Sequence, residues 1–411
     1  MIRKKRMGKG IAKILSGLLV FGMVAGLVPA VPGGTVNAKA TEINGQNATA
    51  EPHTHCVCGT GNLSVERHTH KEETWTGISK LSDINREGNY YLTQDVTLTS
   101  AWTCQRNVNL CLNGHSITRT AKEYYDQNGN NAVIIIKNNV DFTLTDCKGT
   151  GTITHKQGVS GEGVYNDGRF FMYNGIIFGN NGGVKNPGMF FMYGGTITSN
   201  TANNGGGVDN AGTFTMDGGT ITSNTANNGG GVYNDNAGRF IMYGGTITGN
   251  KAEQTYGTEY GGGVYNQGTF NMYGGEITNN TATVGGGGVF NKGTFTMSGG
   301  EITSNSSESY GGGVCYSSSQ LFKMSGTVNI TENKVGTTPN NLYLWNGQQV
   351  SASGLTSGAE IGVTTQIVPI NDSSVPITSD SVSVNCFFSD NSDYETAIDE
   401  NSKVVLKTKT A

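Results

Sequence analysis

The stretches GGGVDNAGTFTMDGGTITSN (205–224), GGGVYNQGTFNMYGGEITNN (261–280) and GGGVFNKGTFTMSGGEITSN (286–305) are close copies of one unit. The unit occurs seven times between Gly161 and Val335, and its valine recurs every 20 to 32 residues. The valines are Val164, Val184, Val208, Val232, Val264, Val289 and Val314, and methionines keep step at Met172, Met192, Met216, Met242, Met272, Met297 and Met324. Such a period predicts stacked units that bury a core only together.

Each unit contains three short strand-like pieces, GVYN, GTFTM and GTITSN, separated by glycine or asparagine. Apolar and polar residues alternate within them, as expected of half-buried strands. Three strands per turn predict a solenoid in which like residues stack about 4.8 Å apart. Valine, phenylalanine, methionine and isoleucine should then form ladders inside it. A propeller would need four strands and about 40 residues per unit, so it fits less well.

One corner of the unit carries a recurring asparagine. The copies are Asn166, Asn186, Asn210, Asn234, Asn266 and Asn291. Stacked side-chain amides hydrogen-bond from one coil to the next in other parallel stacks. We expect the same ladder here.

The first 40 residues do not belong to the repeat. Six basic residues between Arg3 and Lys13 precede an apolar run over 14–28, and Ala38-Lys39-Ala40 matches a small-x-small cleavage site. The pattern predicts a secretory signal peptide over 1–40. A membrane anchor is the alternative, but the apolar run is short and is interrupted by serine and glycine.

Removal of this segment changes the charge of the chain. Cleavage after Ala40 would leave 371 residues with 20 basic and 31 acidic side chains, a net charge of −11. This charge argues against nucleic acid or an anionic membrane as a partner. No long apolar segment follows, so we expect no transmembrane segment after signal cleavage. The protein is expected to be secreted, and either extracellular or associated with the cell surface.

Five regions follow from these patterns. They are the signal peptide (1–40), a His/Cys-rich segment (41–75), irregular early coils (76–160), the regular repeats (161–335), and final coils with a C-terminal cap (336–411). A cap is expected because the open end of a solenoid exposes unpaired backbone groups. The seven cysteines are too scattered for a disulfide scaffold. Cys111 and Cys147 lie in adjacent predicted coils, where they can pair with each other. The odd total leaves at least one of the seven cysteines outside any internal bridge, and binding of metal by some of them is an alternative, so no pairing is assigned.

The GGGVYN…GTFTMYGG units resemble the repeats of a known group. They are similar to the right-handed parallel β-helix repeats of secreted and surface proteins from Gram-positive gut bacteria. The resemblance extends to HTHCVCG, LCLNGHSIT, NLYLWNGQQV and FFSDNSDYE, and so covers most of the chain after residue 40. It implies an all-β, right-handed, three-strand β-helix. It implies little about activity, because this fold carries enzymes, adhesins and passenger domains alike.

The His/Cys-rich segment is the best candidate for a metal site. Four of the six histidines and two of the seven cysteines fall between residues 53 and 70. They are His53, His55, Cys56, Cys58, His68 and His70. Thiolate and imidazole together suit Zn²⁺, which takes four such ligands, so we predict a structural zinc site. Six candidates leave the ligand set open, and a solvated polar linker is the alternative.

An enzyme on this fold would need clustered carboxylates. Polysaccharide lyases and glycoside hydrolases that have the fold implied by the resemblance use such groups to bind Ca²⁺ or as acid and base. Asp209, Asp217, Glu276 and Glu301 stand where other copies have tyrosine or threonine, but none forms a DD or DxD pair. Glu253, Glu259 and Lys251 occupy an inserted loop, which we interpret as solvated. No catalytic residue is assigned.

Outward positions suggest a binding surface instead. Tyr173, Tyr193, Tyr243 and Tyr273 follow the core methionines. Exposed aromatic ladders offer flat apolar faces to sugar rings, although stacking that only stabilises the sheet is an equal alternative. We therefore expect an adhesin-like extracellular or cell-surface protein that recognises glycans or host matrix, with an extracellular polysaccharide or a host glycoprotein as its partner. A polysaccharide lyase or glycoside hydrolase is the alternative.

Overall fold

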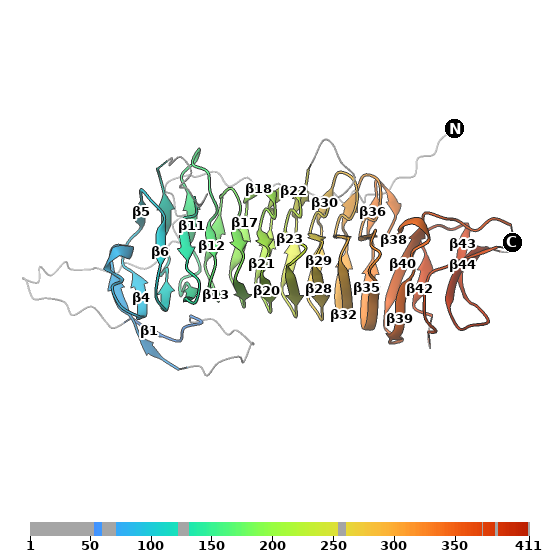
Figure 1. Ribbon diagram of the computed structural model, residues 1–411, viewed down its shortest axis with the longest axis horizontal. Helices are drawn as coiled ribbons and strands as arrows, with labels where there is room; N and C mark the ends of the chain where they lie inside the picture. Colours follow the sequence, from blue (N-terminus) through green and yellow to red (C-terminus); the bar gives the residue numbers. More distant parts are fainter. Residues whose placement is uncertain are drawn as a thin grey trace, which may run out of the picture. The chain divides into compact units, whose positions relative to one another are not determined.

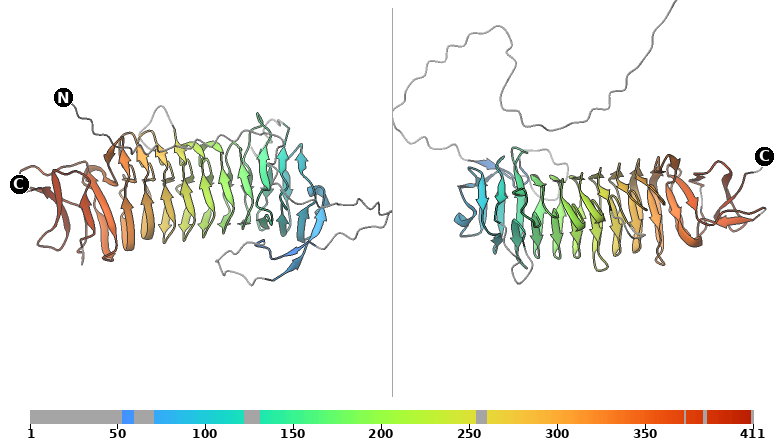
Figure 2. Two further views of the ribbon diagram at one scale, coloured as in Figure 1. Left: turned by 180° about the vertical axis from the view of Figure 1, so that it is seen from behind. Right: turned by 90° about the horizontal axis from the view of Figure 1, so that it is seen from above.

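The computed structural model describes residues 53–59, 71–121, 131–253, 260–371, 373–382 and 385–409, all in one unit that spans 51–411. Parallel strands stacked coil upon coil build this unit, so the predicted three-strand β-helix is confirmed (Figure 1). Figure 2 shows the same row of coils from behind and from above. The described residues contain two short 3-10 helices, η1 (Leu81–Asp83) and η2 (Trp345–Gly347), and no α-helix.

Three faces run along the solenoid, and we name each after its recurring buried residue. The valine face consists of β6 (Trp102–Cys104), β9 (Ile134–Ile136), β12 (Val164–Asn166), β15 (Val184–Asn186), β19 (Val208–Asn210), β23 (Val232–Asn234), β27 (Val264–Asn266), β31 (Val289–Asn291), β34 (Val314–Tyr316) and β38 (Leu342–Leu344). The methionine face consists of β3 (Thr76–Ile78), β4 (Gly88–Leu92), β7 (Val108–Cys111), β10 (Asp141–Thr145), β13 (Arg169–Met172), β16 (Met189–Met192), β20 (Thr213–Met216), β24 (Arg239–Met242), β28 (Thr269–Met272) and β39 (Val350–Leu355).

The isoleucine face completes each coil. It consists of β5 (Val96–Leu98), β8 (Ile117–Arg119), β11 (Thr152–His155), β14 (Ile176–Phe178), β17 (Thr196–Thr198), β21 (Thr220–Thr222), β25 (Thr246–Thr248), β29 (Glu276–Thr278) and β42 (Phe387–Ser389). Two long strands, β32 (Thr294–Thr303) and β35 (Phe322–Thr331), pass from the methionine face to the isoleucine face. Strand β40 (Glu360–Thr365) pairs with both β35 and β38.

The core consists of the ladders expected from the repeat. Val208 pairs in register with the valines one coil before and one coil after it, and its side chain is fully buried. Phenylalanine rings stack from Phe170 to Phe322 with centroids 4.4–4.9 Å apart, close to the spacing of adjacent strands. The repeating methionines of the methionine face, from Met172 to Met297, and the isoleucines of the isoleucine face, from Ile177 to Ile330, are likewise buried. Coils within the regular repeats therefore bury their apolar side chains largely against like neighbours, and the early and late coils bury them against other apolar residues, as Val164 does against Ile134.

Asparagine side chains form two buried ladders. The ladder predicted at the corner after the valine face is confirmed, because each Nδ2–H donates to the next Oδ1 over 2.6–2.7 Å. A second ladder, which we did not expect, follows the isoleucine face. Its members are Asn180, Asn200, Asn224, Asn250, Asn280, Asn305, Asn333 and Asn341.

The second ladder has different groups at its two ends. Within it, each Oδ1 accepts from the backbone N–H and the Nδ2–H of the preceding asparagine of the ladder, as Asn224 does from Asn200 at 3.0 Å in both cases. At the first end, His155 Nδ1 lies 2.9 Å from Asn180 Oδ1. At the last end, the Asp390 carboxylate accepts the backbone N–H and Nδ2–H of Asn341 at 2.7 and 2.6 Å. The amides thus all point the same way along the solenoid.

The GGG tract is required by the close approach of successive coils. Gly205 has a φ of +60°, a conformation that side chains with a Cβ rarely adopt. A Cβ on Gly206 would lie 2.6 Å from the carbonyl oxygen of Gly230, and one on Gly207 would lie 2.6 Å from that of Gly231. Both distances are shorter than van der Waals contact. Glycine is therefore needed at all three positions.

A fourth, short sheet lies along one corner and was not predicted. Its strands are β18 (Thr201–Asn204), β22 (Thr225–Asn228), β26 (Lys251–Ala252), β30 (Thr281–Ala282), β33 (Ser306–Ser307), β36 (Lys334–Val335) and β37 (Thr338–Pro339) (Figure 1). Beyond the coils, β41 (Ser374–Pro376), β43 (Tyr394–Ile398) and β44 (Val404–Thr408) form an antiparallel sheet. At the other end of the chain, before the coils, β1 (Thr54–His55) and β2 (Glu73–Thr74) pair antiparallel.

We expect Val208→Asp to lower the stability of the solenoid by about 3 kcal/mol or more, because it buries an unpaired charge among apolar side chains. The neighbouring substitution Asp209→Val changes an outward side chain and should shift stability by less than about 1 kcal/mol. Melting temperatures followed by circular dichroism measure both effects. Equal shifts for the two variants would contradict the assignment of inward and outward positions.

Asn224→Ala should destabilise the chain by about 2–4 kcal/mol, because two buried donors of Asn200 lose their acceptor. Asn227→Ala provides the matched control, since Asn227 donates only a long, exposed bond of 3.4 Å to Asn203. Urea unfolding of the two variants measures the difference. If both variants lost the same stability, the buried ladder bonds of Asn224 would contribute no more than the exposed Asn227–Asn203 bond.

Candidate metal centre

Two histidines and two cysteines from distant parts of the chain meet beside the early coils. His53 precedes β1 and His55 ends it, and strand residues two apart project to the same side. Cys111 ends β7, and Cys147 follows β10, the neighbouring strand of the methionine face. The register of the solenoid therefore brings together two thiols that are 36 residues apart in sequence.

The geometry of this group suits a tetrahedral metal site. One ligand atom from each of the four side chains lies within 4.8 Å of all the others. The two histidine Nε2 atoms are 2.9 Å apart, the two Sγ atoms are 3.5 Å apart, and His53 Nε2 lies 3.8 Å from Cys147 Sγ. Zinc bond lengths predict tetrahedral edges of about 3.4, 3.8 and 3.6 Å for these pairs. Small side-chain adjustments would complete the site.

Neighbouring groups orient both imidazoles. His55 Nδ1 lies 2.5 Å from the carbonyl oxygen of Cys56, so Nδ1 carries the hydrogen and Nε2 keeps its lone pair for a metal. The His55 ring stacks on Trp75 with centroids 4.4 Å apart, and the indole Nε1–H donates to the His55 carbonyl oxygen at 3.0 Å. The His53 ring stacks on Tyr91 at 4.1 Å. Contacts of this kind hold metal-ligating imidazoles in a fixed orientation in other proteins.

Hydrogen bonding also prepares one thiol for a metal. The Cys111 thiol donates to Cys147, and this contact, with help from His55 and His53, holds the pKa of Cys147 well below the usual range despite its burial. The same contact, together with burial, raises the pKa of Cys111. Burial lowers the pKa of His53. Thiolate and neutral imidazole are the forms that bind Zn²⁺.

The pKa of His55 moves the other way. Burial alone would lower it, but hydrogen bonds with Cys147 and with the Cys56 carbonyl outweigh burial and raise it. These contacts favour the protonated imidazolium of His55. Zinc binding at His55 Nε2 would require the neutral ring and would therefore release a proton.

The six predicted ligands do not all belong to this group. His53 and His55 belong to the four-residue group, whereas Cys56 and Cys58 do not. Both of these cysteines are buried. Burial is the main cause that raises the pKa of Cys58 to about 12, and a hydrogen bond with Cys56 is the next. His68 and His70 lie outside the described residues. Cys111 and Cys147, placed in adjacent coils by their sequence positions, are indeed neighbours, with their Sγ atoms 3.5 Å apart.

The four predicted tyrosines form two stacked pairs, with Asp217 at the equivalent position between them. Tyr193 is buried, and burial raises the pKa of its partner Tyr173, with further contributions from Tyr193, Cys58 and Cys56. Tyr243 and Tyr273 are 46% and 48% exposed. Only the second pair therefore offers a substantial surface to a ligand.

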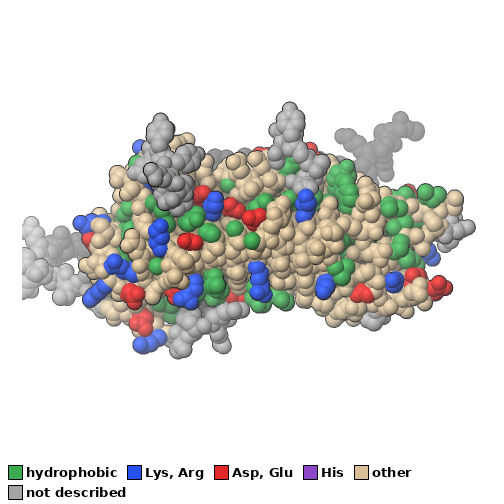
Figure 3. Space-filling view, in the orientation of Figure 1, with side chains coloured by type: hydrophobic (Ala, Val, Ile, Leu, Met, Phe, Trp, Pro, Cys, Tyr) green, Lys and Arg blue, Asp and Glu red, His purple; other side chains and the backbone are tan. Residues whose placement is uncertain are grey.

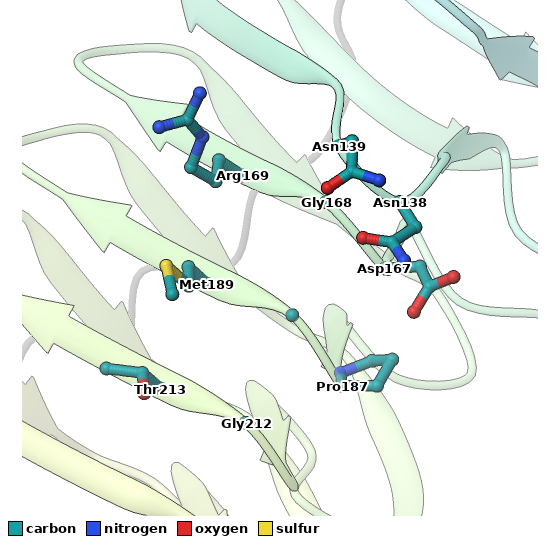
Figure 4. Close-up of a pocket in the computed structure, with 10 residues that line it drawn as sticks. Asn138, Asn139, Asp167, Gly168, Arg169, Pro187, Met189, Gly212 and Thr213 are labelled. Carbon is teal, nitrogen blue, oxygen red and sulfur yellow. The ribbon is translucent and has the colours of Figure 1, made fainter.

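Two hollows in the surface have polar linings. One encloses about 780 Å³ between the valine and methionine faces and includes Asp167, Arg169 and Met189 (Figure 4). The Arg169 guanidinium points away from Asp167 in this view, and it donates to both carboxylate oxygens of Asp141 at 2.6 and 2.8 Å. Its charge is thus already compensated. The other hollow is a groove of about 610 Å³ beside the valine face that includes Asp209.

The fold and the site together define an all-β protein, a parallel β-helix, with a His₂Cys₂ group that can hold a metal ion. Comparisons with protein-family models, curated proteins and solved structures found no match to this chain. Among the described residues, no helix has the length and apolar character needed to cross a membrane.

Zinc analysis of the purified protein tests the site. We expect about one Zn²⁺ per chain, lost in Cys147→Ser and in His53→Ala because each removes one of four ligands. Cys56→Ser and Cys58→Ser are matched controls that should retain the metal if the four-residue group is the ligand set. Elemental analysis of the five proteins measures the content. Zinc lost in the controls but kept in Cys147→Ser would place the metal on the local Cys-x-Cys instead.

Proposed function

We propose that this chain is a secreted binding protein of the adhesin type, located outside the cell or at its surface, that recognises polysaccharides or host glycoproteins. The basic and apolar pattern of residues 1–40 supports export, and the net charge of −11 after residue 40 suits a soluble exported chain. The long solenoid supplies a regular surface on which one ligand can contact several coils.

The observation that carries this proposal is the exposed pair Tyr243 and Tyr273. Their rings stack with centroids 5.1 Å apart and 13° between planes, so each covers one face of the other. Ser298 and Ser325 occupy the equivalent positions in the next two coils and are too short to cover the outer face of Tyr273. Their hydroxyls are hydrogen-bonded to each other at 3.0 Å.

This arrangement has the chemistry of a sugar platform. A sugar ring has a face of C–H groups, which packs on an aromatic ring, and hydroxyls at its edge, which hydrogen-bond to polar neighbours. The Tyr273 ring supplies the first contact and the two serine hydroxyls supply the second. The platform lies at the corner between the methionine and isoleucine faces, where a polymer can run along the solenoid.

We assign the metal a structural role. Zinc on His53, His55, Cys111 and Cys147 would tie the segment before the solenoid to two of its early coils. The imidazoles and thiolates would fill all four positions of a tetrahedral ion, and a closed site of this kind stabilises structure without supplying an open position for catalysis.

A glycan array, together with immobilised host matrix glycoproteins, tests the proposed function. For a ligand so identified, Tyr273→Ala should weaken binding by about tenfold, the loss expected from about 1.4 kcal/mol of ring stacking. Tyr273→Phe is the matched control and should bind within about twofold of the unchanged protein, because it keeps the ring face. Affinities from biolayer interferometry measure both.

Two outcomes would contradict the proposal. One is unchanged affinity in Tyr273→Ala. The other is turnover of a polysaccharide in reducing-sugar or unsaturated-product assays, which would favour a glycoside hydrolase or a lyase over a binding protein.

A further inference from the structure

A groove separates the valine face from the short fourth sheet. It encloses about 610 Å³ and lies beside β15, β19, β18 and β22, on a different face of the solenoid from Tyr243 and Tyr273. Six side chains matter for its chemistry: Glu162, Lys185, Asn203, Asn204, Asp209 and Asn227. In Figure 3, acidic and basic side chains lie close together over this part of the surface.

The register of the solenoid determines what faces the groove. Tyr165, Lys185, Asp209 and Tyr233 occupy one outward position of the valine face in four successive coils. Most copies of the repeat have an aromatic ring at this position, as in Tyr265 and Phe290. Lys185 and Asp209 replace two adjacent rings of this row. One positive and one negative side chain therefore stand at the positions between Tyr165 and Tyr233.

Asp209 is more buried than its charged neighbour Lys185, which is exposed. Burial raises the pKa of its carboxyl to about 6, against the opposing effect of Lys185 and with smaller contributions from Asp235 and Glu162. Within the described part of the chain, no donor reaches the carboxylate within hydrogen-bond distance, and Lys185 does not approach it as an ion pair. A half-buried carboxylate without donors favours a ligand that brings them.

The remaining lining narrows the class of ligand. Asn203, Asn204 and Asn227 present side-chain amides, which donate and accept hydrogen bonds, from the neighbouring strands β18 and β22. Carboxylates at Glu162 and Asp209 repel a polyanion, and Lys185 beside them disfavours a polycation. Hydroxyl groups satisfy all of these partners at once, because each hydroxyl donates to a carboxylate and accepts from an ammonium or amide.

We propose that this groove is a separate binding site for an uncharged saccharide chain, whose hydroxyls donate to Asp209 and accept from Lys185. Tyr165 and Tyr233 occupy the equivalent positions in the coils on either side, and the asparagine amides of the fourth sheet line the side of the groove. The site shares no residue with the Tyr273 platform, so it can exist whether or not that platform binds a glycan.

Titration calorimetry with defined hexasaccharides tests this site. The probes are cellohexaose, mannohexaose and xylohexaose as uncharged chains, hexagalacturonate as a polyanion, and a glucosamine hexamer as a polycation. We expect at least one uncharged hexamer to bind, with its affinity about tenfold weaker in Asp209→Ala and in Lys185→Ala. Asp235→Ala, which removes a nearby carboxylate outside the lining, is the matched control and should bind normally, as should Tyr273→Ala.

The pH dependence provides a second readout. The ionised carboxylate accepts stronger hydrogen bonds from ligand hydroxyls than the protonated carboxyl does. Affinity should therefore be greatest above the pKa of Asp209, about 6, and should fall as the pH is lowered from about 7.5 to 5. Asp209→Asn should remove this dependence. Lys185, Glu162 and Asp235 are the other charged groups near Asp209. Unchanged melting temperatures show that the variants are folded.

The proposal is overturned if no uncharged hexamer binds, if a charged hexamer binds more tightly, or if Asp209→Ala leaves affinity unchanged. Loss of binding in Tyr273→Ala with Asp209→Ala unaffected would also overturn it, because the saccharide would then occupy only the tyrosine platform. Loss in Asp209→Ala alone supports the groove even if the platform binds nothing.

Discussion

In-register hydrogen bonding between successive coils is the constraint on which the rest of the structure depends. Each coil must keep its inward positions in line with those of its neighbours, because a slip of one residue would exchange the buried and exposed sides of a strand. Insertions are therefore confined to corners, as between Asn234 and Gly238, while the faces keep step. The same constraint places Cys111 beside Cys147 and Lys185 beside Asp209, so both candidate sites are products of the coil register.

Much of this fold could be predicted because its physical cause is repeated in the sequence. Alternation around Phe214 and Ile221 indicates strands, and a period of one coil indicates stacking, so three faces and the first asparagine ladder follow. The fourth sheet could not be predicted in the same way. Its strands are two to four residues long, and only 201–204 and 225–228 share the sequence TANN. The second ladder was missed because Asn224 and its equivalents read as ordinary corner residues until their burial is known.

The sites were partly predictable for a related reason. His53 and His55 are two residues apart, so their shared side of a strand follows from sequence alone. Cys111 and Cys147 carry no local signal, and only the length of a coil brings them together. Asp209 was visible as a departure from the aromatic consensus, but its half-buried position depends on the strand Thr201–Asn204 that the sequence does not reveal. Prediction therefore succeeded where a pattern is local and failed where it needs the fourth sheet.

The eight-membered asparagine ladder makes the solenoid directional. Each amide passes on one hydrogen bond by accepting at its oxygen and donating from its nitrogen, so every member needs a successor that can do both. Asp390 takes both donors of Asn341, and its carboxylate also accepts from Thr364 at 2.9 Å. An ionised carboxylate has no hydrogen to pass on. A further coil could not join this row of amides without an asparagine at that position, so Asp390 acts as a chemical stop that sets the length of the ladder.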